Sequence, residues 1–296
     1  MVTINLLQVF LWTFRRKEQD VVNLYNTLSA VMQLATGGKM LNFGYWNENT
    51  KNPLQAQDEL CLLVAKLAEL SSAKIVIDVG SGFSAPAMYW KSLYNFLCIS
   101  CVNINFHQLK SPTSVIVNNV VDHDVTVSST DDISLVNATS TTLPLSDHCA
   151  DRVIALESAQ HFKPLTQFIQ ESKRILKQDG CLVIAMPVTT GIKQSSFTKL
   201  GILSLTWSSE HYDLDSVKSV TAKEGFQIDE IQKIGSHVYE PLTNYYIKNR
   251  ETLRQNILRE YPSYLESILY KSLLKMKDAS KNGIIDYVLL KCSPTN

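Results

Sequence analysis

The chain has 296 residues, with 28 basic and 28 acidic side chains and 45% apolar residues. This length and composition are typical of one large globular domain with additions, or of at most two domains. The formal charge of zero and the lack of a long basic run argue against a nucleic-acid binder, because such proteins neutralise phosphates with clustered Lys and Arg. No apolar run reaches the roughly 20 residues that span a bilayer, and no secretory signal is evident, so we expect a cytoplasmic protein.

Six cysteines lie mostly within apolar runs. Cys98 and Cys101 are the closest pair, but residues three apart in a strand point to opposite faces. We therefore expect the cysteines to pack in the core rather than to form disulfides or bind metal. We predict no metal site, since four histidines without ligand-like spacing are expected to be structural or superficial: His107, His148, His211 and His237.

Helices are predicted over the first 70 residues. Near the N-terminus, apolar residues recur at helical spacing and a basic run, 15–17, follows. This helix either docks on the protein as a lid over the active site or makes peripheral contact with a membrane, and both interpretations stay open. Two further helices are predicted over 18–36 and about 54–70. The apolar residues of the first helix are Ile4, Leu7, Phe10, Leu11 and Phe14.

From residue 74, short apolar runs alternate with helical patterns, which is typical of a parallel sheet with crossover helices. An amphipathic helix that begins near residue 166 is expected to end near Asp179 and Gly180. Residues 111–136 predict an irregular insertion. Buried strands are expected at 74–80, 96–104, 150–158 and 181–188.

The C-terminal part predicts a helix, a glycine turn and a strand over 216–234, a long helical stretch over 241–280, and a last strand over 284–292. The fold class predicted from these patterns is α/β. We expect a doubly wound, mostly parallel sheet of about seven strands, Rossmann-like, with an N-terminal helical lid and a helical insertion before the last strand.

The most informative motif is VIDVGSG at 76–82, where a buried strand carries Asp78 and leads through a glycine-containing turn into a helix. Ligands of α/β sheets bind outside the carboxyl ends of the strands. The next strand ends in Asn103 and Asn105, without the carboxylate that holds the ribose in many NAD proteins. An NAD-dependent oxidoreductase is kept as an alternative function.

Five segments in this order resemble S-adenosylmethionine-dependent methyltransferases of small molecules. The resemblance covers about residues 20–240, and its nearest members are sugar O-methyltransferases of antibiotic pathways, sarcosine and dimethylglycine N-methyltransferases, and tocopherol and sterol C-methyltransferases. It implies S-adenosylmethionine as the cofactor and a small-molecule substrate. The segments are LNFGYW (41–46), VIDVGSGFSAPA (76–87), VNINFHQL (102–109), NATSTTLPLSDHCADRVIALESAQHF (137–162) and KRILKQDGCLVIA (173–185).

The resemblance also implies site residues. His161 would face the substrate as the catalytic base, with a structural histidine as the alternative. Tyr25 and Trp46 would cover the cofactor from the lid, although Trp46 could equally be a core aromatic. The other implied cofactor-binding residues are Asp78, Gly80, Ser81, Gly82, Asn103, Ile104, Gln108, Asn137, Ala138, Leu156 and Glu157.

Two departures from the family pattern bear on activity. Asn103 and Asn137 stand where relatives usually carry a carboxylate, and neutral hydrogen bonds are weaker than charge-assisted ones. Met186 stands where some relatives place an acidic residue beside the substrate. A catalytically silent methyltransferase fold that serves as a binding or regulatory protein is therefore a further alternative.

The segments 190–212 and 240–270 are rich in Tyr, Phe, Leu and Trp. Together with the lid they predict a pocket for a bulky apolar or aromatic substrate. The acceptor atom (O, N or C) and the oligomeric state stay open. We expect a helical lid over 1–53, a cofactor-binding core over 54–192, and a substrate-capping region with the last strands of the same sheet over 193–296.

Overall fold

The computed structural model describes residues 5–15, 17–37, 40–110, 132–190 and 212–295. The chain forms two compact units, and each combines three segments of the sequence. The helical unit consists of Met1–Leu60, Pro187–Val217 and Lys233–Val288. The sheet unit consists of Cys61–Met186, Lys218–Gln232 and Leu289–Asn296. The predicted boundaries at residues 53 and 192 stay predictions.

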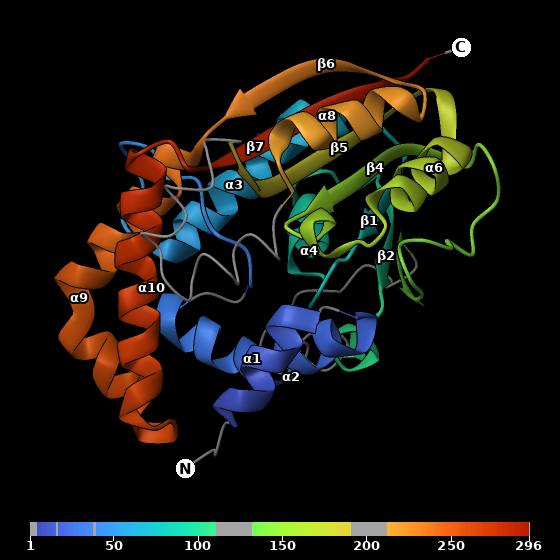
Figure 1. The fold of residues 1–296 in the computed structure, drawn as a ribbon. Coiled ribbons are helices and arrows are strands. Elements are labelled where there is room, and N and C mark those ends of the chain that lie inside the picture. Colours follow the sequence, from blue (N-terminus) through green and yellow to red (C-terminus); the bar gives the residue numbers. More distant parts are fainter. Residues whose placement is uncertain (1–4, 16, 38–39, 111–131, 191–211, 296) are drawn as a thin grey trace, which may run out of the picture. The chain divides into compact units, whose positions relative to one another are not determined.

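Seven strands form one sheet, in the order β3-β2-β1-β4-β5-β7-β6 (Figure 1), which confirms the predicted number. β1 (Ile75–Val79) pairs in parallel with β2 (Cys98–Asn103) on one side and with β4 (Ala150–Leu156) on the other. β3 (Ile133–Asn137) pairs in parallel with β2, and β5 (Leu176–Thr189) with β4. The remaining strands are β6 (Phe226–Lys233) and β7 (Ile285–Pro294).

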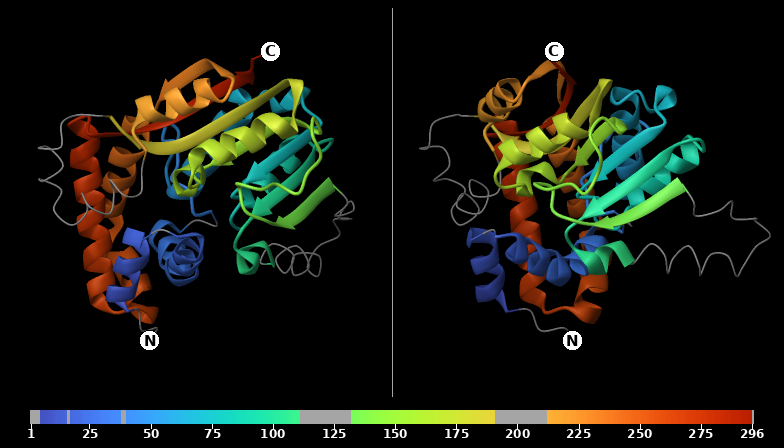
Figure 2. Two further views of the ribbon diagram at one scale, coloured as in Figure 1. Left: turned by 45° about the vertical axis from the view of Figure 1, so that its right-hand side comes forward. Right: turned by 90° about the vertical axis from the view of Figure 1, so that its right-hand side faces the viewer.

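Helices cover both faces of this sheet, as the predicted doubly wound fold requires. α4 (Ala85–Leu93) follows β1, α6 (Leu165–Ile175) follows β4, and the two helices lie on opposite faces (Figure 2). α6 buries one apolar side that includes Phe168 and Ile169. Trp90 of α4 is fully buried and donates a 2.9 Å hydrogen bond to the carbonyl of Cys61 in α3 (Pro53–Leu67). The other short elements are η1 (Leu70–Ser72), η3 (Ala159–His161) and α8 (Leu214–Lys223).

The helix that precedes β5 ends earlier than the sequence predicted. α6 ends at Ile175, and β5 begins at Leu176 and runs through Asp179 and Gly180. Residues 177–179 are polar because they lie half-buried or exposed at the start of a long strand, before its buried part begins. The strand register also shifts between Ala150 and Arg152 of β4, which a periodicity argument does not detect.

The helical unit contains α1 (Leu6–Arg15), α2 (Glu18–Thr36), the short η5 (Gly235–His237) and two long helices. The predicted stretch 241–280 is divided into α9 (Tyr239–Glu260) and α10 (Ser263–Lys281). The break lies at Pro262, and the preceding Tyr261 is extended, with φ −124° and ψ 152°. A residue before proline disfavours the helical region, which accounts for the break.

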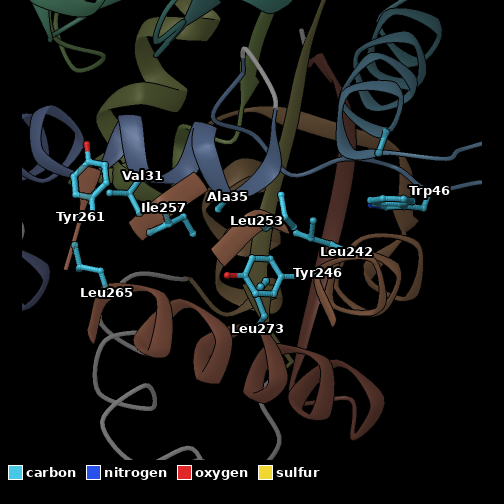
Figure 3. Close-up of a cluster of buried hydrophobic side chains, with 11 residues drawn as sticks. Val31, Ala35, Trp46, Leu242, Tyr246, Leu253, Ile257, Tyr261, Leu265 and Leu273 are labelled. Atoms are coloured by element: carbon cyan, nitrogen blue, oxygen red, sulfur yellow. The ribbon is translucent and has the colours of Figure 1, made fainter. Parts of the chain in front are cut away.

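An apolar cluster holds the helical unit together (Figure 3). It gathers Val31 and Ala35 from α2, side chains of α9 and α10, and Trp46 from the segment after α2. Val9 of α1 packs against it, whereas Leu7, Phe10 and Leu11 on the same helix are exposed. The helix near the N-terminus is therefore confirmed, and its contact with a membrane stays a prediction.

An ion pair between buried Glu266 and partly exposed Arg250 joins α9 to α10. Glu266 is 1% exposed and accepts hydrogen bonds from Arg250 at 2.8 and 3.1 Å and from the Tyr246 hydroxyl at 3.3 Å. The Arg250 guanidinium also lies 3.6 Å from the centre of the Tyr270 ring. The bonds from Arg250 hold the pKa of Glu266 below its ordinary value. Tyr246 is thereby fixed between the two helices.

Other sequence expectations can be compared with the described residues. β3 lies within the stretch predicted as irregular, and residues 111–131 of that stretch lie outside the described part of the chain. Each of the six cysteines carries a thiol rather than half of a disulfide. Among the described residues, no cluster of His, Cys, Asp or Glu is suited to a metal ion, and no helix is both long and apolar enough to cross a bilayer.

Candidate active site

Asp78 lies near the carboxyl end of β1, directly opposite Cys101 in the neighbouring strand. It is 2% exposed, and its Oδ2 atom has no hydrogen-bond partner in the part of the chain that the structure describes. Burial disfavours the charged carboxylate and raises the pKa of Asp78 to about 7. Burial, followed by the nearby Asp78 carboxylate, raises the pKa of the Cys101 thiol to about 12, so this thiol is inert.

In the turn after β1, Gly80 is tightly packed against a neighbouring segment, whereas Gly82 has free space beside it. Gly80 has a φ of 77°, and a Cβ placed there would lie only 2.3 Å from the Cβ of Ser158. Ser158 in turn donates a 2.6 Å hydrogen bond to the carbonyl of Val79, which ties the segment after β4 to the turn. Gly82, with a φ of 55°, has no atom within 4 Å of the corresponding position. A ligand can therefore approach the backbone at Gly82.

Three side-chain amides connect the ends of β1, β2 and β3. Asn103 donates to the carbonyl of Gly82 at 3.1 Å and to Oε1 of Gln108 at 3.0 Å. Asn137 donates to the backbone carbonyls of Asn103 at 2.9 Å and Ile104 at 3.0 Å. Gln108 is 6% exposed, and its Nε2 is a buried donor without a partner among the described residues.

These hydrogen bonds explain what Asn103 and Asn137, which stand where relatives usually carry a carboxylate, do in the structure. An amide nitrogen donates where a carboxylate cannot, so Asn137 anchors β3 to the end of β2. Ala138 adds a backbone bond from its N–H to the carbonyl of Asn103 at 3.3 Å. The Oδ1 atom of Asn137 is then the part of this side chain that could accept from a ligand.

The segment after β4 brings several polar residues to the same edge of the sheet. Leu156 ends the strand, and Glu157 adopts a φ of 51°, a left-handed conformation that non-glycine residues rarely take. Gln160 is 5% exposed, donates to the carbonyl of Glu157 at 2.8 Å, and has an Oε1 atom without a partner among the described residues. His161 is half-buried, with its Nε2 atom 3.4 Å from Nε2 of Gln160.

The structure thus brings the predicted site residues of the sheet unit together at the carboxyl ends of β1, β2, β3 and β4. Sequence reasoning missed Ser158 and Gln160. Both lie in the stretch ESAQHF, where polar residues follow a buried strand. Their place at the carboxyl end of that strand was the available signal.

His237, which the sequence predicted to be structural or superficial, stacks on the Tyr45 ring with the ring centres 5.0 Å apart. Its Nδ1 atom lies 3.0 Å from the carbonyl oxygen of Trp46.

Two predicted cofactor residues belong to the helical unit. Tyr25 lies on α2, and its carbonyl accepts a bond from Ser29 at 2.5 Å. Trp46 is 8% exposed within the apolar cluster, and its ring lies 5.6 Å from that of Tyr245. Their role over the cofactor stays a prediction. Residues 191–211 of the expected substrate loop, with His211, lie outside the described residues.

Comparison with known proteins identifies this arrangement. A methyltransferase-domain family matches residues 77–184. Erythromycin 3''-O-methyltransferase of Saccharopolyspora erythraea is 23% identical over 277 residues, which cover 87% of this chain and 85% of that protein. The 27-O-demethylrifamycin SV methyltransferase of Amycolatopsis mediterranei is 24% identical over 147 residues, which cover 50% of this chain and 51% of that protein. These matches support an S-adenosylmethionine-dependent methyltransferase of small molecules.

Solved structures agree on the fold of the methyltransferase. The cyclopropane synthase MmaA2 from Mycobacterium tuberculosis superposes with a TM-score of 0.74 at 14% identity, covering 91% of this chain and 95% of that one. The [4+2]-cyclase SpnF superposes with a TM-score of 0.72 at 18% identity, covering 95% and 97%. Since these proteins are named for different reactions, the likeness concerns the fold and not the substrate. The NAD-dependent oxidoreductase considered from the sequence does not fit this family.

Proposed function

We propose that this methyltransferase binds S-adenosylmethionine at the carboxyl ends of β1, β2 and β4 and methylates a bulky apolar or aromatic small molecule. The observation that carries the proposal is a set of three buried polar atoms at that edge without partners in the described chain: Asp78 Oδ2, Gln108 Nε2 and Gln160 Oε1. Unpaired buried polar atoms are costly, so a ligand that pairs with them gains that free energy on binding.

The residues at this edge fit the parts of the cofactor. The unpaired carboxylate oxygen of Asp78 would take the ammonium group of the methionine portion. Gly80, Ser81 and Gly82 would line that portion, and the open space at Gly82 leaves room for it. The remaining roles in the sheet unit follow the family: Asn103, Ile104 and Gln108 would hold the ribose and the adenine edge, and Asn137 and Ala138 would contact the adenine amino group. Leu156 and Glu157 would follow the cofactor along β4.

The proposed acceptor is a hydroxyl oxygen. This atom is proposed because a relative that matches most of the chain is an O-methyltransferase by name. A nitrogen or carbon acceptor is an alternative outcome of the experiment below. When bound, the donor supplies a methyl carbon attached to a positively charged sulfur. The chain itself has to hold the acceptor in line and keep water away, and alignment of this kind can supply about 7–11 kcal/mol of a barrier.

His161 is proposed to accept the proton of the hydroxyl group. Gln160 donates through Nε2 to the carbonyl of Glu157 at 2.8 Å, so its amide presents N–H rather than C=O toward the ring. The 3.4 Å approach to Nε2 of His161 then favours the tautomer in which this ring nitrogen is unprotonated. An unprotonated imidazole nitrogen is the form that a general base requires.

The test combines calorimetry with a transfer assay on a panel of hydroxyl, amine and activated-carbon acceptors. We expect S-adenosylmethionine to bind and a methyl group to reach a bulky apolar alcohol. We expect His161→Ala to lower kcat about 100-fold while donor affinity stays within about twofold, because the base acts only in the chemical step. Unchanged kcat in His161→Ala would make this histidine structural. Donor binding without transfer to any acceptor would instead favour a binding or regulatory protein.

A further inference from the structure

One side of α1 presents apolar side chains to solvent. Leu7 is 67% exposed, Phe10 is 40% exposed and Leu11 is 39% exposed. At about 100° per residue these three side chains share one side of the helix, whereas Val9 lies on the opposite side. Val9 packs against the apolar cluster of the helical unit. α1 is therefore held to its unit by one side and exposes a second apolar side, which we call the apolar stripe.

The charges beside the apolar stripe have one sign. Residues 1–17 contain three basic side chains, Arg15, Arg16 and Lys17, and no acidic one. Arg15 and Lys17 are exposed where α1 ends. The next acidic residues, Glu18 and Asp20, lie in the first turn of α2, and Asp20 is buried and accepts a 2.8 Å hydrogen bond from Arg15. A surface that approaches α1 therefore meets apolar side chains followed by basic groups.

The size of the apolar stripe bears on what could cover it. At roughly 200 Å² for a whole side chain of this size, Leu7, Phe10 and Leu11 together expose on the order of 300 Å². A stable contact between two protein chains buries about 800 Å² on each of them. A second copy of this chain would also bring an equally basic segment toward the first, and like charges repel. A surface of opposite charge that takes up individual apolar side chains fits the stripe better.

We propose that α1 is a docking helix for an anionic lipid bilayer. Helices that lie in a membrane interface combine an apolar side with basic groups, and they bind more strongly to anionic lipids. The apolar stripe enters the boundary between headgroups and acyl chains, and Arg15 and Lys17 lie among the headgroups. α1 has 10 residues and is about 15 Å long, half the thickness of the hydrocarbon core, so it lies along the bilayer rather than across it.

The test is co-sedimentation of the full chain with lipid vesicles, without methyl donor or acceptor, so its outcome is independent of the proposed transfer reaction. We expect binding to vesicles with about one phosphatidylserine for every two phosphatidylcholines, and at least about tenfold weaker binding to pure phosphatidylcholine. Raising NaCl from about 0.05 to 0.5 M should weaken binding to the anionic vesicles severalfold, because salt screens the basic groups. Absence of binding to the anionic vesicles, or equal binding to both compositions, would overturn the proposal.

Substitutions locate the contact on α1. Leu7→Glu and Leu11→Glu should each weaken binding to the anionic vesicles at least about tenfold, because an apolar contact is replaced by a repelled carboxylate. Leu7→Gln adds no charge and should weaken it about threefold. Phe96→Glu, which adds the same charge at an exposed aromatic residue of the sheet unit, should stay within about twofold of the wild type, since it leaves the apolar stripe intact.

Two further outcomes of these variants would also contradict the proposal. Wild-type binding by both Leu7→Glu and Leu11→Glu, with far-UV circular dichroism unchanged, would place the lipid contact elsewhere on the chain. A wild-type dimer in analytical ultracentrifugation that Leu7→Glu converts to a monomer would show that the apolar stripe joins two copies of the chain instead.

Discussion

Asp78 is a carboxylic acid whose pKa is raised to about 7 by complete burial. An ammonium group of a bound donor stabilises the ionised form, so binding requires the carboxyl group to lose its proton. We therefore expect the affinity for S-adenosylmethionine to fall about tenfold for each pH unit from 7 to 5. In Asp78→Asn, affinity should be lower at pH 7 and nearly constant over this range, as calorimetry at each pH would reveal.

The same carboxyl group affects stability in the opposite direction when no donor is present. Its folded-state pKa of about 7 lies above the ordinary value of 3.8, so the folded chain binds more protons between these pH values. The stability that the neutral carboxyl contributes is present below 3.8 and is lost as pH rises through 7. Donor-free Asp78→Asn should therefore be more stable than the wild type at pH 8 and nearly equal at pH 4. A pH-independent difference in urea unfolding would contradict the raised pKa.

Gly80 and Gly82 make a matched pair for a stability prediction. A methyl group at Gly80 would meet the Cβ of Ser158 at 2.3 Å, whereas one at Gly82 would meet nothing within 4 Å. Both positions have positive φ, so Gly82→Ala should cost about 1 kcal/mol from backbone strain alone. Gly80→Ala should cost about 3 kcal/mol, because overpacking against Ser158 adds to the strain. Urea unfolding measures both values, and equal costs would mean that the segment after β4 moves away freely.

At the scale of the element, Asn137 links two strands rather than acting as a weakened substitute for aspartate. The sequence alone left the effect of this neutral side chain on cofactor affinity open, because the loss of charge is visible in a sequence and the gained donors are not. Asn137→Asp removes both bonds to the end of β2 and places a carboxylate against two carbonyl oxygens. We expect it to lower donor affinity about tenfold in calorimetry, although relatives usually carry the acid.

A control for added negative charge is Asn49→Asp, an exposed position in the helical unit. This variant should bind the donor as the wild type does. Tighter binding by Asn137→Asp would show that direct recognition of the adenine by a carboxylate outweighs the link between β2 and β3.

The elements themselves were predictable to different degrees, for physical reasons. β1 and β4 are central strands buried on both faces, so their sequences are continuously apolar and easily recognised. The predicted start of β5 was wrong because Lys177 to Asp179 lie half-buried or exposed near the beginning of a long strand, where polar residues resemble the end of a helix. The site residues of the sheet unit came from the family resemblance. The partners of Ser158 and Asn137 depend on contacts between distant segments, which no local pattern encodes.

For the whole molecule, the consequence of a working cofactor site is a change in global stability. At a concentration about 100 times its Kd, S-adenosylmethionine should raise the free energy of unfolding by about 2.7 kcal/mol. Scanning calorimetry should detect this as a rise of several degrees in Tm. NAD⁺ at the same concentration should leave Tm unchanged, since residues 77–184 match a methyltransferase domain. A comparable shift with both compounds would indicate non-specific binding.

The division into two units also has a consequence for folding during translation. The backbone passes from one unit to the other after residues 60, 186, 217, 232 and 288, and β7, at the end of the chain, contributes to both. During translation, neither unit can acquire all of its segments until β7 has left the ribosome. The apolar strands β1 and β4 are therefore synthesised long before either unit can be completed, which leaves them exposed to aggregation during that interval.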